Sequence, residues 1–76
     1  MEIEFHQLDL RYEALRRRDA KKERHVLASL AEVGQLLPVV VVGAGQADRY
    51  ILLDGFKRER GLRRLHADTV RATVWT

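Results

Sequence analysis

Four consecutive valines, Val39–Val42, directly follow Pro38, and they limit what this chain can fold into more than any other feature. β-Branched side chains are restricted in a helix and pack well on a pleated sheet. An uninterrupted apolar run favours a strand that is covered on both faces. Pro38 is compatible with this strand, because its first residue can lack a backbone donor. The chain therefore needs a central strand with other elements packed against it.

The flanking patterns predict two helices and further strands. Apolar residues recur at helical spacing after Asp19, a good N-cap residue, and Gly34 suits the end of that helix. A second helix is expected from a cap at Asp54 to about His66. Strands are expected at residues 2–5, 49–53 and 70–75. The 76 residues thus predict one α+β domain, 1–76, with a small mixed sheet of about four strands and two main helices.

Several classes of protein are excluded by composition. No cysteine is present, so disulfides, thiolate metal sites and thiol catalysis are excluded. The longest apolar run, residues 36–42, is far shorter than the roughly 20 residues that a membrane span needs. The N-terminus is acidic and mixed, unlike a secretory signal. We therefore expect a cytoplasmic protein without a membrane partner.

The positive charge is concentrated in two segments. Net charge is +3, yet residues 11–24 carry seven basic and three acidic side chains, and residues 54–66 carry five and two. This pattern indicates either an anion-binding surface or two solvated helix faces. In the first segment, a nucleic-acid backbone could be followed by Arg16, Arg17, Arg18, Lys21, Lys22 and Arg24. This hypothesis is weakened by the absence of interleaved aromatic residues.

The second segment contains a strand–turn–helix junction, Leu53–Arg58. The first N–H groups of a helix lack internal partners and favour anions. Cations in the first turns oppose the helix dipole, and a bound anion would offset that cost. Lys57, Arg58 and Arg60 are therefore candidates for a phosphate site. The alternative is that Arg58 pairs with Asp54, Glu59 or another carboxylate.

Other chemistry is weakly indicated. Asp54 and Glu59 are the local carboxylates that a metal-dependent reaction could use, and neither is a confident catalytic residue. His6, His25 and His66 lie far apart in no ligand spacing, so no metal site is predicted.

Two stretches together resemble the N-terminal domain of ParB-type partition proteins, in the ParB/sulfiredoxin-like superfamily. Residues 29–41 match the pattern Ser-Ile-x-x-x-Gly-x-x-x-Pro followed by a β-branched strand. Residues 50–62 resemble a strand followed by Gly-x-x-Arg-x-x-Ala, with Gly61 in place of the Ala. The resemblance covers about residues 25–75 and agrees with the predicted fold.

The resemblance implies a nucleotide site. ParB-type domains bind CTP, and Gly-x-x-Arg grips the phosphates. The matching positions imply that CTP or another triphosphate, with Mg²⁺, is held by Gly34, Gly55, Phe56, Lys57, Arg58 and Arg60. The implied partners are the nucleotide, DNA through other domains or the basic patches, and a second copy in a homodimer.

The departures from the family pattern separate three hypotheses. Phe56 replaces an acidic residue that the family links to metal and hydrolysis, and also the cysteine of sulfiredoxins. The chain length leaves no room for the DNA-binding and dimerisation domains of a whole partition protein. We expect a nucleotide-binding module linked to DNA partition or a mobile element. The alternatives are a small ParB-like nuclease or phosphotransferase, and a ligand-free DNA- or protein-interaction domain.

Overall fold

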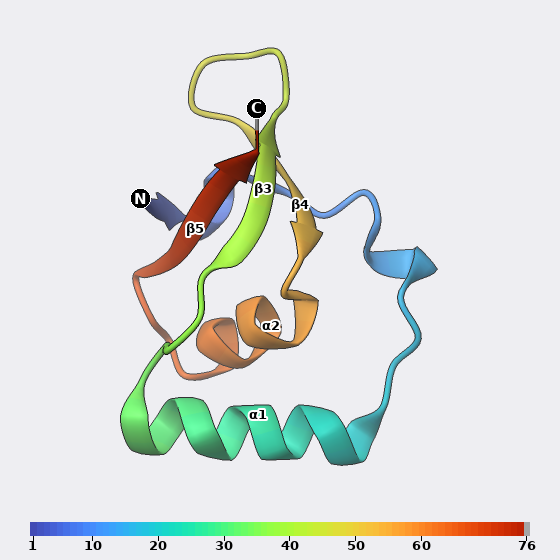
Figure 1. The fold of residues 1–76 in the computed structure, drawn as a ribbon, viewed down its shortest axis with the longest axis vertical. Coiled ribbons are helices and arrows are strands. Elements are labelled where there is room, and N and C mark those ends of the chain that lie inside the picture. The colour runs from blue at the N-terminus through green and yellow to red at the C-terminus, as the bar shows by residue number, and fades with distance from the viewer. Residues whose placement is uncertain (76) are drawn as a thin grey trace.

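A computed structural model describes residues 1–75, in which a mixed sheet stands above two stacked helices (Figure 1). The chain forms β1 (Glu2–Glu4), β2 (Leu8–Asp9), α1 (Ala20–Val33), β3 (Val39–Gly43), β4 (Tyr50–Asp54), α2 (Phe56–Arg64) and β5 (Thr69–Trp75). Two single 3₁₀ turns, η1 (Phe5–Gln7) and η2 (Glu13–Leu15), lie in the N-terminal part. The α+β class and the element order are confirmed. The sheet has five strands rather than about four, because the two-residue β2 adds an edge.

The valine run forms the central strand. The strand order is β1-β5-β3-β4-β2, in which β3 is parallel to β5 and antiparallel to β4. Val39 and Val41 are completely buried, whereas Val40 and Val42 are only half-buried. One face of this strand is buried and the other is half-buried, so its coverage is less complete than the valine run predicts.

A short arch joins the two edges of the sheet. β1 pairs with β5 at one edge, β2 pairs with β4 at the other, and only the three residues of η1 separate them. Four residue steps span at most about 14 Å, whereas five flat strands at the usual spacing would place the edges about 19 Å apart. The sheet must therefore curl to bring its edges together, and the arch closes one side of the core.

The core lies between the curled sheet and α2. It consists of Ile3, Leu8, Leu30, Val39, Val41, Leu52, Phe56, Leu62, Val70 and Ala72. Gly61 lies where α2 approaches α1. A Cβ atom at Gly61 would lie 2.7 Å from Leu30 Cδ1. The two helices are therefore in close contact at this point.

The ends of both helices can be compared with the sequence predictions. Asp19 caps α1 by accepting the Lys22 N–H at 3.1 Å, and Gly34 follows that helix with φ of +78°. Asp54 does not cap α2, because it is still extended and pairs with Val40 in the β3–β4 ladder. The N-cap is Gly55, which has a left-handed conformation. α2 ends at Arg64, earlier than expected.

Two residues of the α2 region have an exposure that their type would not suggest. Leu65 lies beyond the helix and is 40 % exposed, whereas Leu62 is buried. Glu59 takes an inward position and is 1 % exposed.

Among residues 1–75, no helix has both the length and the apolar character that crossing a bilayer requires.

Candidate nucleotide site

The site is centred on the β4–α2 junction. Gly55 has φ of +95°, and a Cβ atom there would lie 2.6 Å from Val39 Cγ1. Glycine is therefore required both by the backbone conformation and by the close approach of β3. No side chain caps the first N–H groups of α2. These donors, with the positive end of the helix dipole, are available to an anion.

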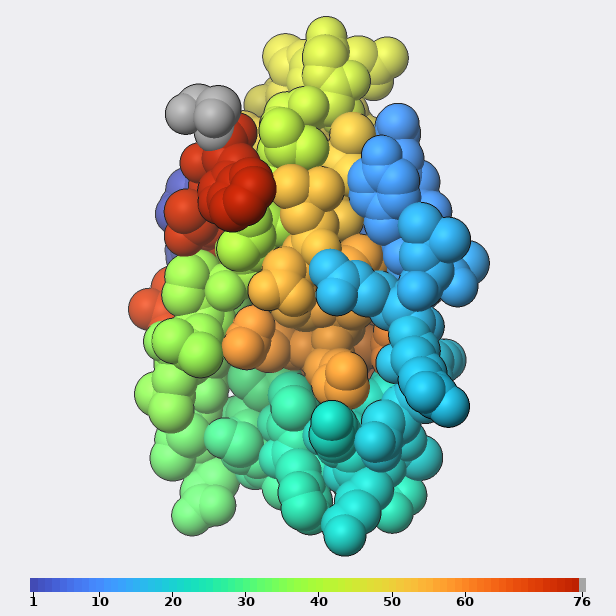
Figure 2. Space-filling view, turned by 45° about the vertical axis from the view of Figure 1, so that its right-hand side comes forward, coloured from blue at the N-terminus to red at the C-terminus, as the bar shows by residue number. Residues whose placement is uncertain are grey.

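The starts of both helices face one cavity of about 470 Å³. Figure 2 shows this side of the molecule, where the start of α2 lies between α1 and the loop that precedes α1. The lining comes from two stretches of the chain that are distant in sequence, residues 16–26 and 54–60. It consists of Arg16, Arg17, Asp19, Lys22, Val26, Asp54, Gly55, Phe56, Lys57, Arg58 and Arg60. Part of each basic segment predicted from sequence therefore contributes to one surface.

Positive charge exceeds negative charge around this cavity. Six lining residues are basic and two are acidic. Arg58 is half-buried and has no carboxylate within 4.0 Å among residues 1–75. The carboxylates expected to pair with it are engaged elsewhere, since Asp54 lies 3.8 Å from Arg16 and Glu59 lies 2.5 Å from Arg63. The alternative of an internal ion pair for Arg58 is therefore not realised in the described chain.

Other basic side chains of the lining are also without an ion-pair partner in residues 1–75: Arg17, Lys22 and Lys57. Clustered cations repel one another, and an anion that binds between them lowers the electrostatic free energy of the cluster. The described cavity is thus electrostatically suited to a multiply charged anion.

Arg16 forms a wall of the cavity that the sequence did not indicate. Its Nη2 donates a hydrogen bond to the Leu53 carbonyl oxygen at 2.5 Å. Its guanidinium carbon lies 5.2 Å from the centre of the Phe56 ring, a cation–π distance. The sequence pattern placed Arg16 in a nucleic-acid surface, whereas the fold brings it back to the β4–α2 junction.

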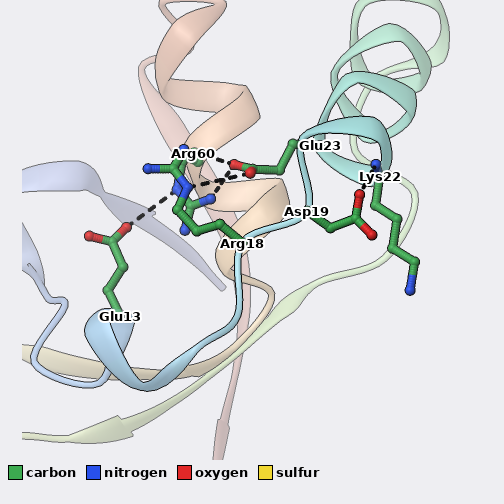
Figure 3. A network of polar contacts seen from close by, with 6 residues as sticks. All are labelled: Glu13, Arg18, Asp19, Lys22, Glu23 and Arg60. Atoms are coloured by element: carbon green, nitrogen blue, oxygen red, sulfur yellow. Dashed lines mark hydrogen bonds and ion pairs between the residues drawn. The ribbon is translucent and has the colours of Figure 1, made fainter.

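Arg60 differs from the unpaired Arg17, Lys22, Lys57 and Arg58, because two carboxylates already neutralise its charge. Its Nε lies 3.4 Å from Glu13 Oε2, and its Nη1 contacts Glu23 Oε1. Glu23 also accepts a hydrogen bond from Arg18 Nη2 at 3.1 Å (Figure 3). Arg18 and Arg60 hold the pKa of the Glu23 carboxyl below its ordinary value. The Arg60 side chain is only 16 % exposed.

Comparison with known families identifies the chain. The sequence model described as ParB N-terminal domain matches residues 1–76. This chain belongs to the ParB N-terminal domain family. The match agrees with the resemblance of residues 29–41 and 50–62, and the Gly-x-x-Arg segment of the family corresponds to the junction just described. No curated protein sequence matches this ParB N-terminal domain.

Solved structures share the fold. Sulfiredoxin from Arabidopsis thaliana superimposes with a TM-score of 0.85 at 18 % identity, over 100 % of this chain and 83 % of that one. C-terminally truncated chromosome-partitioning protein ParB from Caulobacter crescentus, complexed with CTP-γ-S, has a TM-score of 0.80 at 25 % identity. That alignment covers 99 % of this chain and 43 % of the ParB chain. A free serine kinase in complex with AMP has a TM-score of 0.79 at 19 % identity, over 99 % and 30 % of the two chains.

The weak catalytic candidates of this ParB N-terminal domain are not brought together. Asp54 lines the cavity and is 67 % exposed. Glu59 is not part of the lining, and its buried carboxylate is in an ion pair with Arg63. Burial raises the pKa of the Glu59 carboxyl, and the nearby Arg63 partly offsets that rise. A two-carboxylate site is therefore absent from this part of the described chain.

The remaining predicted residues lie outside the cavity. Gly34 follows the far end of α1 from Asp19, so the fold does not bring it to the cavity. Arg18 and Arg24 line a separate depression, and Lys21 is exposed on α1. Of the six residues predicted to follow a nucleic-acid backbone, three are in the cavity lining: Arg16, Arg17 and Lys22.

Proposed function

We propose that this ParB N-terminal domain is the nucleotide-binding module of a DNA-partition system, and that it holds CTP or a related triphosphate between the starts of α1 and α2. The observation that carries the proposal is the half-buried, unpaired Arg58 beside the uncapped N-terminus of α2. The cavity volume of about 470 Å³ is within the usual range for small-ligand sites. A ParB relative with CTP-γ-S and the same fold adds support.

In this proposal, each group has a distinct role toward the phosphates. No side chain caps the first N–H groups of α2, so they are open to phosphate oxygens. Lys57 and Arg58 neutralise charge from the α2 side. Arg17 and Lys22 do so from the opposite wall. The ring of Phe56, covered by Arg16, occupies the position of the acidic family residue, so we expect binding to exceed turnover.

Magnesium would enter this site with the triphosphate. Among residues 1–75 there is no group of three histidine or acidic residues that could hold a metal ion. Asp19 is engaged as the cap of α1, and Asp54 is the remaining carboxylate of the lining. The donor set does not fit a metal site built by the protein alone. Phosphate oxygens commonly supply the ligands that Mg²⁺ then needs.

The wider role rests on the family. C-terminally truncated ParB from Caulobacter crescentus complexed to the centromeric parS site has a TM-score of 0.79 at 26 % identity, and this chain covers 40 % of it. The chain therefore spans less than half the length of these ParB structures. We propose that parS-like DNA and a second copy engage the whole protein through other segments, in the cytoplasm.

Calorimetric titration with CTP tests the proposal. We expect saturable binding, with ATP, GTP and UTP as competitors and with Mg²⁺ present or absent. Arg58→Ala should weaken binding at least about tenfold, because a charge-assisted contact to phosphate is lost from a half-buried position. Arg64→Ala, the same change at the exposed far end of α2, should leave affinity within about twofold as the matched control.

Two outcomes would contradict the proposal. One is a folded wild-type protein that binds none of the triphosphates. The other is an equal loss of affinity in Arg58→Ala and Arg64→Ala, which would indicate a diffuse charge effect. Salt-dependent binding to DNA of any sequence, without nucleotide binding, would instead favour the interaction-domain alternative.

A further inference from the structure

The basic residues of the cavity divide into two groups. Lys57 and Arg58 have no ion-pair partner among residues 1–75, whereas Arg60 lies between Glu13 and Glu23. Arg60 with these two carboxylates has a net charge of −1, and inclusion of Arg18 brings the total to zero. By Coulomb's law such a group does not attract an anion. Its contribution to a phosphate site must therefore be geometric.

The geometry concerns residues 10–19, the connecting segment that carries Arg16 and Arg17 to the cavity. Leu10 packs against the core, but beyond it the segment buries little apolar surface, since Tyr12 is 40 % and Leu15 is 79 % exposed. Its main attachments to the rest of the fold are polar. Glu13 contacts Arg60, Arg16 bonds to the Leu53 carbonyl, and Arg18 contacts Glu23 on the first turn of α1. Arg60 of α2 contacts Glu13 within this segment and Glu23 just after it on α1 (Figure 3).

We propose that Arg60 is a positioning residue and not a phosphate ligand. Through Glu13 and Glu23 it holds the connecting segment and the start of α1 against α2, so that Arg16, Arg17 and Lys22 face the phosphates. The inference rests on the proposed nucleotide site and revises the role that the family pattern gave to Arg60. Planar guanidinium suits this role, because it can donate to two carboxylates at once in a fixed geometry.

The proposal has a test in which the sign of the effect decides. Glu23→Gln removes a negative charge near the cavity, so simple electrostatics predicts tighter binding of CTP. If Arg60 positions the segment, the same change should weaken CTP binding by about fivefold, since contacting groups in one ionic network are strongly coupled. Glu32→Gln, an exposed position near the other end of α1, is the matched charge control and should leave affinity within about twofold.

A second readout needs no nucleotide. Backbone amide exchange reports opening of the η2 turn, where Glu13, Leu15 and Arg16 donate within the segment. Arg60→Ala and Glu23→Gln should each speed exchange there by about fivefold, while the Ala44 amide of the β3–β4 turn is unchanged. Arg60 is the one ion-pair partner of the Glu13 side chain in the described chain, so Glu13→Gln should add no further change to Arg60→Ala.

The outcomes separate this inference from the proposed function. Tighter CTP binding by Glu23→Gln, or a loss of affinity in Arg60→Ala without faster exchange, would identify Arg60 as a phosphate ligand and overturn the proposal. If the wild type binds no triphosphate, the nucleotide site fails. Exchange in residues 10–19 then still decides the positioning role, because unchanged exchange in Arg60→Ala would refute it.

Discussion

Gly55→Ala should lower the free energy of unfolding by about 2–4 kcal/mol, the largest stability effect that we expect from a single methyl group in this chain. The added Cβ would meet Val39 at 2.6 Å for Cγ1, 2.9 Å for Cβ and 3.1 Å for Cα. The last of these atoms is backbone, so a side-chain rotation cannot relieve the contact. The positive φ of 95° adds a conformational cost that glycine does not have.

Denaturant unfolding, followed by circular dichroism, measures this effect. Gly43→Ala is the matched control, since no atom lies within 4 Å of the added Cβ and its φ is not positive. We expect that control to change stability by less than about 1 kcal/mol. Equal stabilities for the two variants would mean that β4 and β3 do not approach at Gly55 as described.

Arg63→Ala should destabilise the fold by about 2 kcal/mol at neutral pH, and by less as the pH falls toward 5. Arg63 is half exposed, and its guanidinium is the cation closest to the buried Glu59, so the usual cost of breaking a buried ion pair must be discounted for solvent. Burial raises the pKa of Glu59 and Arg63 opposes the rise, so the variant carries a still higher pKa. Between the ordinary pKa of a carboxyl and its raised pKa in the folded protein, the folded state binds more protons than the unfolded state. Folding stability therefore decreases as the pH rises through that range.

Thermal unfolding between pH 5 and pH 8 tests the sign. The deficit of Arg63→Ala relative to the wild type should grow with pH, because the unprotonated Glu59 is then left without its cation. In a Glu59→Gln background, Arg63→Ala should cost less and lose this pH dependence. A deficit that is equal at both pH values in both backgrounds would contradict the explanation.

Local patterns predicted most of the secondary structure. The valine run, the alternation near both ends of the chain and the Asp19 cap depend on neighbours in sequence, and the structure agrees with them. β2 could not be predicted, because two residues carry no detectable period. The predicted end of α2 at about His66 is too late, because His66 has a positive φ of 60° that the sequence does not indicate.

The candidate site was predicted only in part, because much of it depends on long-range contacts. The junction residues Gly55 and Arg58 were found from their local pattern. The return of Arg16 to Leu53 joins residues that are 37 positions apart, and helical spacing contains no information about it. The same holds for the pairing of Arg60 with Glu13. Glu59 was considered as a weak catalytic residue or a partner for Arg58, yet the packing of α2 buries it beside Arg63.

The arch from β1 to β2 has a consequence for how the chain acquires its structure. β1 pairs with β5 across nearly the whole sequence, as in Ile3 with Val70, and β3 needs β5 as its parallel neighbour. A growing polypeptide therefore cannot complete the sheet until its last strand has left the ribosome. Loop closure over such a distance is slow. During that interval the β3–β4 hairpin exposes its valines, so we expect the nascent domain to rely on rapid release or on a chaperone more than a helical domain of equal size.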